Sequence, residues 1–329
     1  MKRLSGQFWD RVQDDLEKIE TALKNNLNSH LDLVSEVAGH LLFSGGKRLR
    51  PLLIILCARI CGYNKGDEIN LSTAVEYLHA ATLLHDDIVD GAALRRGKPV
   101  ANSIWGNPIT VLVGDFLLAR ASSIAAGTGK MGIIRVMAEI MEEMSQGEID
   151  QLLRKGDLKI SENSENDYMR VIEQKTAVLF QGACQTGAII ADAEKKKEKA
   201  LSGFGLNLGI AFQLIDDLID YISDTKTLGK EAGADLKEGK LTLPVIHALK
   251  KASPFDRDCM ERIIRNNEFS FHDFRELIEL LEKYKGISYV KDRAAFYIQS
   301  AKESLSIFAP SEYKEILMAI ADYTLVRNT

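Results

Sequence analysis

The sequence predicts an all-α protein, and three observations support this fold class. Apolar side chains recur with the 3.6-residue spacing of amphipathic helices over most of the 329 residues. Only 6 prolines interrupt the chain. No run of alternating β-branched residues bounded by turn residues marks a strand.

The first expected helices lie in the N-terminal third. Helical periodicity covers residues 8–42 and ends before the loop FSGGKRLRP. Pro51 opens a helix that runs to about residue 60, because proline is tolerated in the first turn of a helix. A third helix covers about 71–90, and the glycine- and proline-rich segment 91–108 is predicted to be a loop with a short turn.

The rest of the chain is also expected to be helical. The predicted helices are 109–127, 131–154, 165–190, 196–223 and 241–251, with further amphipathic stretches in 256–325. No Pro-rich or Gly/Ser-rich linker divides the chain. We therefore expect a single domain spanning residues 1–329.

Composition and charge narrow the class of protein. The net charge of −5 argues against nucleic-acid binding, which usually needs a basic surface. The 4 cysteines show no CxxC spacing and are expected to be reduced thiols. The N-terminus lacks the apolar core of a signal peptide, and apolar runs such as LLIILCA are too short to span a bilayer. We expect a cytoplasmic protein without a transmembrane segment.

Two similar acidic clusters each end an apolar segment, because LHDDIVD recurs later in the chain as LIDDLID. Residues four apart on a helix share a face. The pairs aligned in this way are Asp86 with Asp90, and Asp216 with Asp220. The middle aspartates, Asp87 and Asp217, point about 100° away.

A solvated helix end explains one such cluster about as well as a metal site does, but two copies favour the metal. Stacked carboxylates repel each other unless a cation bridges them. Oxygen-only ligands suit Mg²⁺, which completes its coordination shell with water and substrate phosphates. An EF-hand is excluded, because neither cluster continues into the required calcium loop.

Phosphates should be accompanied by cationic side chains, and several occur near the acidic clusters. The candidates are Lys47, Arg48, Arg50, Arg95, Arg96, Lys175, Lys230 and Lys240. Any one of these side chains, taken alone, is more often a solvated surface charge than a phosphate ligand. Together they predict a site for one or two diphosphates, which arginine and lysine bind through charge-assisted hydrogen bonds.

The helix face that leads to Asp86 carries Thr82, His79, Leu78 and Val75. A metal-bound carboxylate pair would thus end an apolar helical wall. A ligand with a diphosphate head and an apolar tail fits this pattern. We infer a prenyl diphosphate.

At this point the sequence resembles the trans-prenyl diphosphate synthases of the polyprenyl synthetase family, and most closely the long-chain, octaprenyl type. The matching motifs cover nearly the whole chain in order: GGKRLRP, LLHDDIVD followed by RRGKP, GDFLLARA, KTA, and QLIDDLID with GKEAGADLKEGKLTLP. The resemblance implies an isoprenoid-synthase bundle of helices around a deep central cavity, usually in a homodimer.

The resemblance also implies residue roles. Isopentenyl diphosphate would be held by Lys47, Arg50, His79 and Arg96. The allylic diphosphate would be held by Arg95, Lys175, Lys230 and Lys240. Three Mg²⁺ ions would be bound directly by Asp86, Asp90 and Asp216, with support from Asp87, Asp217 and Asp220. The developing cation would face oxygen dipoles of Thr176 and Gln213.

The implied reaction follows from charge. Magnesium and the basic residues would stabilise the departing pyrophosphate, so that the allylic C–O bond ionises. The double bond of isopentenyl diphosphate would then attack the carbocation, and the pyrophosphate is the expected proton acceptor. Water must be excluded because it would quench the cation.

Product length is predicted from the residues before the first cluster, where short-chain members of the family carry bulky aromatics. Here those positions hold Ala81 and Thr82, both small. We expect a heptaprenyl to nonaprenyl product, with octaprenyl as the central expectation. The floor of the product tunnel is expected to include Cys57, Leu78, Met137 and Met141, although methionines at such spacing are more often core residues.

Three alternatives remain. The same fold could make farnesyl or geranylgeranyl diphosphate. The chain could also be a subunit of a heteromeric synthase, either the catalytic one or a non-catalytic partner, although such partners tend to lose the acidic clusters and both are intact here. A terpene cyclase is weaker, because such enzymes usually replace the second DDxxD motif. The C-terminus keeps a single Arg327 where some family members have paired basic residues, which leaves its role open.

Overall fold

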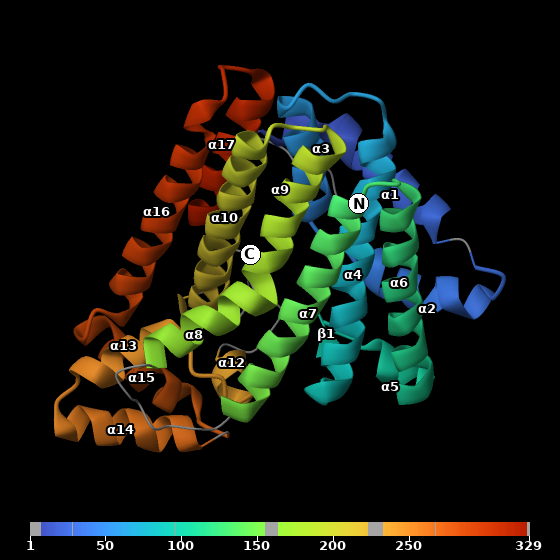
Figure 1. Cartoon of the computed structure of the whole chain (residues 1–329). Helices are drawn as coiled ribbons and strands as arrows, with labels where there is room; N and C mark the ends of the chain where they lie inside the picture. Colours follow the sequence, from blue (N-terminus) through green and yellow to red (C-terminus); the bar gives the residue numbers. More distant parts are fainter. Residues whose placement is uncertain are drawn as a thin grey trace. The chain divides into compact units, whose positions relative to one another are not determined.

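A computed structural model of the chain describes residues 8–27, 29–95, 97–154, 164–222, 233–266 and 268–327 (Figure 1). These residues are almost entirely helical, which confirms the all-α prediction. Residue contacts divide the chain into two compact units. The first unit comprises Met1–Glu142, Leu179–Gly205 and Lys302–Ile320, and the second comprises Glu143–Val178, Leu206–Ala301 and Ala321–Thr329. The single-domain expectation stays a prediction.

The first unit is built around one long helix, α4. Its elements are η1 (Trp9–Val12), α1 (Gln13–Asn26), α2 (Asp32–Leu42), α3 (Leu49–Ile60), α4 (Asp67–Val89), α5 (Ala101–Trp105), α6 (Asn107–Gly127), α9 (Val178–Ile190), η3 (Leu305–Ile307) and the first parts of α7 (Met131–Arg154), α10 (Lys195–Ile222) and α17 (Glu312–Val326). Helix α4 packs against α1, α3 and α6. Its residues 71–78 are all buried, including the polar Ser72, Thr73 and Glu76, so this part of the helix is covered on every side.

The predicted helix over 8–42 is wrong in one respect, because the chain leaves the helix between α1 and α2. In this connection the hydroxyl of Ser29 accepts a hydrogen bond from the N–H of Leu31 at 3.1 Å. Serine and asparagine side chains compete in this way with helical backbone hydrogen bonds. Helix α2 starts one residue later, at Asp32.

The predicted loop over 91–108 contains more regular structure than expected. Strands β1 (Leu94–Arg95) and β2 (Lys98–Pro99) pair antiparallel, with Leu94 opposite Pro99. Gly97 in the turn has φ 74°, which suits the tight reversal of a two-residue hairpin. The short helix α5 then leads into α6.

The second unit contains α8 (Ser164–Ile172), η2 (Glu173–Ala177), α12 (Ala234–Lys237), α13 (Leu243–Lys251), α14 (Pro254–Arg265), α15 (Phe271–Lys283), most of α16 (Gly286–Ser304) and the remaining parts of α7, α10 and α17. Its core joins α10, α13, α15 and α16 through buried side chains such as Leu218, Leu277 and Val290. Serines cap α14 and α15, where Ser253 and Ser270 each accept a hydrogen bond from an N–H three residues later.

The predicted helix over 165–190 is interrupted by η2, a π-helical turn that contains Lys175 and Thr176. Helix α7 approaches this turn closely at Gly147. A Cβ atom at that position would lie 2.9 Å from the backbone nitrogen of Lys175, so only glycine fits. Such π-helical turns occur frequently at functional sites.

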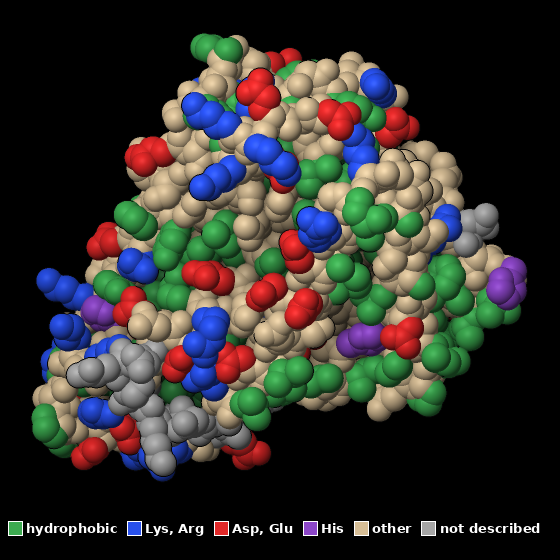
Figure 2. All heavy atoms as spheres, viewed as in Figure 1, with side chains coloured by type: hydrophobic (Ala, Val, Ile, Leu, Met, Phe, Trp, Pro, Cys, Tyr) green, Lys and Arg blue, Asp and Glu red, His purple; other side chains and the backbone are tan. Residues whose placement is uncertain are grey.

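Helix α6 qualifies the expectation that no segment could span a bilayer. By length and composition alone it could cross a membrane, and 33% of its most apolar window is buried. A core helix of a soluble protein passes the same test. Its exposed side chains include Val111 and Leu112, and hydrophobic side chains gather over the region of α5 and α6 (Figure 2).

Candidate functional site

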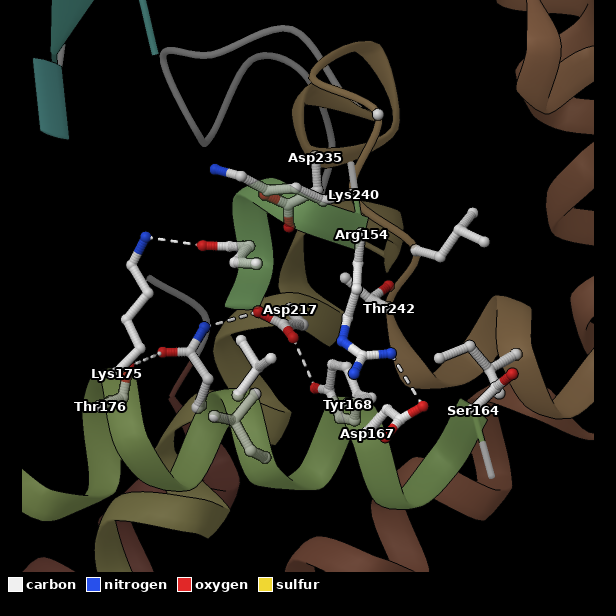
Figure 3. Close-up of a pocket in the computed structure, with 17 residues that line it drawn as sticks. Arg154, Ser164, Asp167, Tyr168, Lys175, Thr176, Asp217, Asp235, Lys240 and Thr242 are labelled. Atoms are coloured by element: carbon white, nitrogen blue, oxygen red, sulfur yellow. Dashed lines mark hydrogen bonds and ion pairs between the residues drawn. The ribbon is translucent and has the colours of Figure 1, made fainter. Parts of the chain in front are cut away.

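A cavity of about 440 Å³ lies in the second unit, next to the second acidic cluster (Figure 3). It brings together five residues that the sequence singled out: Lys175, Thr176, Gln213, Asp217 and Lys240. They come from η2, α10 and the segment after α12. The cavity walls also include Arg154 and Tyr168, which sequence reasoning missed.

A chain of hydrogen bonds crosses this cavity and ends on Asp217 (Figure 3). The hydroxyl of Thr176 donates to Oε1 of Gln213 at 2.8 Å, and Nε2 of Gln213 donates to Oδ1 of Asp217 at 2.6 Å. From the other side, the hydroxyl of Tyr168 donates to Oδ2 of Asp217 at 2.5 Å. The side chain of Asp217 is therefore fixed at both oxygens.

The carboxyl of Asp217 has a raised pKa, and burial is the largest cause. Burial raises its pKa to about 7, although the hydrogen bonds from Tyr168 and Gln213 lower it. Burial and the negative charges of Asp217 and Asp220 also raise the pKa of Asp235, well above its usual range. This acidic group is electrostatically suited to a divalent cation.

Asp220 has a structural contact of its own. Its two carboxylate oxygens accept hydrogen bonds from the backbone N–H groups of Ala234 and Asp235, at 3.2 and 3.1 Å. These groups open α12, where unpaired N–H groups favour a carboxylate. The end of α10 is thereby tied to the segment that leads to Lys240.

Asp216 is not among the residues that line this cavity and is the most exposed aspartate of the cluster, with 54% of its side chain accessible. Its Oδ1 atom accepts a hydrogen bond from Nη2 of Arg327 at 3.0 Å. Arg327 also donates to the carbonyl of Phe212 at 2.7 Å, and its guanidinium carbon lies 3.6 Å from the centroid of the Phe212 ring. The C-terminal arginine therefore contacts the second cluster, which the sequence left open.

Lys175 is held in place by acceptors on α7. Its Nζ atom contacts Oε1 of Gln151 at 2.7 Å and also pairs with Glu148. The ammonium of Lys240 lies 2.6 Å from Oε2 of Glu238. Both lysines line the cavity and could bind an anionic ligand there.

The first cluster, in the first unit, has the same layout with a different partner. Asp87 is buried at 2% exposure, whereas Asp86 and Asp90 are half-buried, in keeping with the rotation that helical spacing predicts. Asp87 is bound by Arg95, whose Nε and Nη2 lie 2.9 and 2.8 Å from its Oδ1. The guanidinium predicted to hold an allylic diphosphate thus also neutralises the buried carboxylate of this cluster.

The basic loop GGKRLRP divides its side chains between the surface and the interior. Lys47 and Arg50 are half-buried, and the guanidinium carbon of Arg50 lies 4.5 Å from the centroid of the Phe180 ring. Arg48 is buried and bound to two glutamates, so its grouping with the diphosphate-binding cations was wrong. His79 is half-buried on α4.

The predicted chain-length residues are mostly buried. Leu78, Ala81, Met137 and Cys57 have 0–2% exposure, and Thr82 is half-buried. Their role stays a prediction. Two predicted diphosphate ligands, Arg96 and Lys230, lie outside the described residues.

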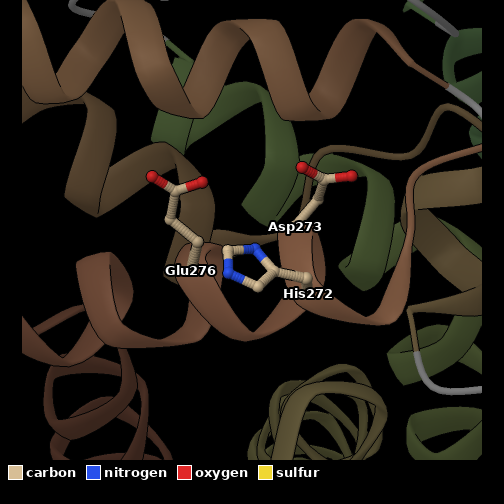
Figure 4. A group of neighbouring side chains, drawn as sticks. All are labelled: His272, Asp273 and Glu276. Carbon is tan, nitrogen blue, oxygen red and sulfur yellow. The ribbon is translucent and has the colours of Figure 1, made fainter.

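A further group that could geometrically hold a metal ion lies on α15, where ligand atoms of His272, Asp273 and Glu276 are within 4.8 Å of one another (Figure 4). Asp273 accepts hydrogen bonds from Ser270 in a capping box, which lower its pKa. Glu276 accepts from Cys259 and Arg262. These carboxylates already serve the helix start and its neighbour, so we assign no function to the group.

The chain is similar to known proteins along its whole length. The family model described as polyprenyl synthetase matches residues 31–281. Octaprenyl diphosphate synthase of Haemophilus influenzae is 38% identical, over 100% of both chains. Heptaprenyl diphosphate synthase component 2 of Bacillus subtilis is 34% identical, over 95% of this chain and 88% of that one. A polyprenyl synthase of Caulobacter crescentus, solved in complex with calcium and isoprenyl diphosphate, superposes with a TM-score of 0.91 at 39% identity and covers 99% of this chain and 100% of that one.

Proposed function

This chain belongs to the polyprenyl synthetase family and is therefore a prenyl-transferring enzyme with the all-α isoprenoid-synthase fold. We propose that it condenses isopentenyl diphosphate with an allylic diphosphate such as farnesyl diphosphate. The product is a long all-trans polyprenyl diphosphate, with octaprenyl as the central expectation. The octaprenyl synthase of Haemophilus influenzae, which matches over its full length, supports this product class.

The observation that carries the proposal is the shared layout of the two acidic clusters. In each, the middle aspartate is buried and hydrogen-bonded, while the preceding aspartate, Asp86 or Asp216, is more exposed. Buried carboxylates fixed in this way orient the end of each helix and place the outer carboxylates on its more exposed side, where a cation could reach them. The proposed direct ligands are Asp86, Asp90 and Asp216.

The chemistry of these donors fits Mg²⁺. All are carboxylates, which a hard cation prefers, and because burial raises the pKa values of Asp217 and Asp235, added positive charge would favour their ionised forms. The Caulobacter crescentus relative was solved with calcium, another oxygen-binding divalent cation. Bound magnesium would supply positive charge to the departing pyrophosphate. About three ions are expected for each active site.

The chain's own residues supply the rest of the proposed site. Lys175 and Lys240 line the cavity and are placed to bind the allylic diphosphate. The hydroxyl proton of Thr176 is directed to Gln213, so the lone pairs of its oxygen are what it can present to a developing carbocation. The proposed ligands of isopentenyl diphosphate are Lys47, Arg50, His79 and Arg96. The allylic diphosphate would also be bound by Arg95 and Lys230. Arg96 and Lys230 lie outside the described residues.

Product length is proposed to depend on the α4 face before Asp86. Ala81 and Leu78 are fully buried there, and neither carries the aromatic ring that would obstruct a growing chain. The deeper Met137 and Cys57 are also buried and belong to the same unit. We propose that these residues line the path of the growing chain.

The proposed reaction is tested by incubating the purified protein with labelled isopentenyl diphosphate, farnesyl diphosphate and Mg²⁺. Mass spectrometry of the extracted lipid should show a polyprenyl diphosphate of seven to nine units, centred on eight. A farnesyl or geranylgeranyl product would replace the long-chain proposal with the short-chain one. Full turnover in the presence of a chelator would refute the proposed magnesium dependence.

A second candidate is the catalytic subunit of a heteromeric synthase. The observation in its favour is the match to heptaprenyl diphosphate synthase component 2 of Bacillus subtilis. The two candidates differ in the activity of the protein alone. Turnover without another polypeptide supports the first, whereas turnover only after a cell extract restores a partner supports the second.

A homodimer is proposed from the apolar face of α6. Val111 and Leu112 are exposed there, at 39% and 63%, in a helix of largely apolar composition. A second copy would bury this face at little cost, because few charges interrupt it. A cytoplasmic location is part of the same proposal, and cell fractionation with light scattering would test both.

A further inference from the structure

The middle residue of the basic loop, Arg48, has a role that its sequence neighbours do not share. It connects α2 to α3 and is buried, with 4% of its side chain accessible. Its backbone is left-handed, with φ 52° and ψ 33°, which is uncommon for a residue other than glycine. A residue held in this conformation needs strong side-chain contacts to keep it there.

Arg48 makes those contacts with three different helices. Its Nε atom binds Oε1 of Glu20 on α1 at 2.6 Å, and its Nη1 atom binds Oε1 of Glu76 on α4 at 2.5 Å. Its Nη2 atom donates to the carbonyl of Leu42, the last residue of α2. Each nitrogen of the guanidinium is thus engaged, and a diphosphate has no access to it.

The electrostatics of this contact favour a permanent ion pair. Burial alone would lower the pKa of Arg48, but the charges and hydrogen bonds of Glu76 and Glu20 outweigh it and raise the pKa. The two glutamates are 20% and 10% exposed at their side chains, so solvent screens them weakly. Removing the arginine would leave two acceptors poorly compensated.

The segment that ends at Arg48 has no helical backbone of its own. Gly45, with φ 116°, lies in the stretch before it, and residues 45–48 belong to neither helix. Lys47 directly precedes Arg48, and Arg50 follows it by two residues. The contacts of Arg48 therefore fix the backbone between these two cationic side chains.

We propose that Arg48 is a positioning residue for isopentenyl diphosphate. It does not touch the substrate but fixes the loop backbone, so that Lys47 and Arg50 point at the diphosphate. This inference rests on the proposed function, in which those two side chains hold isopentenyl diphosphate.

The chain contains a matched control for this role. Arg59, near the other end of α3, also clamps that helix between α1 and α4, because it binds Asp15 at 2.7 Å and lies 3.7 Å from Glu68. Its side chain is also largely buried, at 13% exposure. Arg59 lies outside the basic loop, so it should share the structural function of Arg48 without the positioning function.

The test compares Arg48→Lys with Arg59→Lys in the full-length protein. Lysine keeps the charge but has one donor group in place of a planar fork, so it cannot reach all three acceptors. We expect Arg48→Lys to raise the KM for isopentenyl diphosphate about tenfold, with little change in kcat or in the KM for farnesyl diphosphate. Arg59→Lys should lower Tm about as much as Arg48→Lys does, but it should leave both KM values unchanged.

A second measurement separates this inference from the proposed function, because it needs no substrate. Amide hydrogen exchange of residues 44–49 should accelerate in Arg48→Lys but not in Arg59→Lys. Unchanged exchange would overturn the inference, as would equal KM values in the two variants. By contrast, if Lys47→Ala and Arg50→Ala both keep a normal KM for isopentenyl diphosphate, the substrate assignment of the loop is wrong, and the exchange data still decide whether Arg48 orders it.

Discussion

The two acidic clusters look alike in sequence but neutralise their buried aspartate in different ways. In LHDDIVD on α4, Asp87 is bound by Arg95, which follows it by eight residues. In LIDDLID on α10, Asp217 is held by the neutral donors Tyr168 and Gln213, and burial raises its pKa to about 7. The cationic contact of the second cluster falls instead on the exposed Asp216, through Arg327.

This difference shows that a repeated motif fixes the layout of carboxylates but not their charge balance. Both clusters place the middle residue inside because helical spacing turns it away from its neighbours. Which side chain neutralises it depends on elements that are distant in sequence. The buried aspartate of the first cluster is paired with a cationic side chain, whereas that of the second is held by neutral donors.

The largest expected effect comes from removing an outer aspartate. Asp86→Ala and Asp216→Ala should each lower turnover by about a thousandfold in excess Mg²⁺, because the departing pyrophosphate loses a metal ion. Asp67→Ala, in the first turn of α4, is the control and should retain normal turnover. Near-normal rates in Asp86→Ala would contradict the metal assignment.

The buried Asp217 of the second cluster should make the free energy of unfolding depend on pH when metal ions are removed. The pKa of Asp217 in the folded protein, about 7, exceeds its ordinary value of 3.8, so folding favours the protonated carboxyl. In a chelator, the free energy of unfolding should therefore fall as pH rises from about 4 to 7, by at most about 4 kcal/mol. Urea unfolding at each pH measures this fall.

Two variants sharpen that measurement. Asp217→Asn should flatten the pH dependence, because the titrating group is gone. Tyr168→Phe should extend the fall to higher pH, because the hydroxyl of Tyr168 lowers the pKa of Asp217. A pH profile that is identical in all three proteins would show that Asp217 is not the group responsible.

A smaller effect is expected at the C-terminal arginine. Arg327 holds one oxygen of Asp216, and such support typically orients a metal ligand. Arg327→Met should weaken Mn²⁺ binding, measured by calorimetry, about tenfold. Arg293, whose guanidinium carbon lies 5.3 Å from the ring centroid of Tyr297, offers a control: Arg293→Met should leave Mn²⁺ binding unchanged. Tighter binding in Arg327→Met would show instead that the arginine competes with the metal.

The smallest change in turnover is expected from residues five positions before each cluster. These are Ala81 and Ala211, both fully buried. Ala81→Phe should shorten the product by one or more isoprene units, because its ring would protrude where the chain grows. Ala211→Phe should destabilise the fold by about 1–3 kcal/mol through overpacking without changing the product. Mass spectrometry of the products decides, and an unchanged product in Ala81→Phe would refute the tunnel placement.

The sequence predicted the helices best where local pattern alone decides them. The predicted helix over 131–154 coincides with α7, and the one over 196–223 differs from α10 by one residue at each end. The break between α1 and α2, the β1–β2 hairpin and the π-helical turn at Lys175 were missed. The first two depend on turn chemistry, and the third is accompanied by a close approach of Gly147 from α7, which no local pattern reveals.

The candidate site could be predicted by residue type but not by partner. Spacing identified Asp217, and the family resemblance identified Gln213; the structure adds that the two are bonded to each other and that Tyr168 also donates to Asp217. The basic motif suggested that Arg48 binds phosphate, whereas the structure places it among Glu20, Glu76 and Leu42. A charged residue in a motif can serve either substrate or fold, and only its long-range contacts distinguish the two.

The central claim, that both acidic clusters bind divalent cations around a prenyl diphosphate, is tested most directly by anomalous diffraction. Crystals of the full-length protein would be soaked with Mn²⁺ and a non-reactive thiolo analogue of farnesyl diphosphate. We expect anomalous peaks within about 2.5 Å of carboxylate oxygens of Asp86, Asp90 and Asp216. A bound analogue with no peak at either cluster would contradict the account.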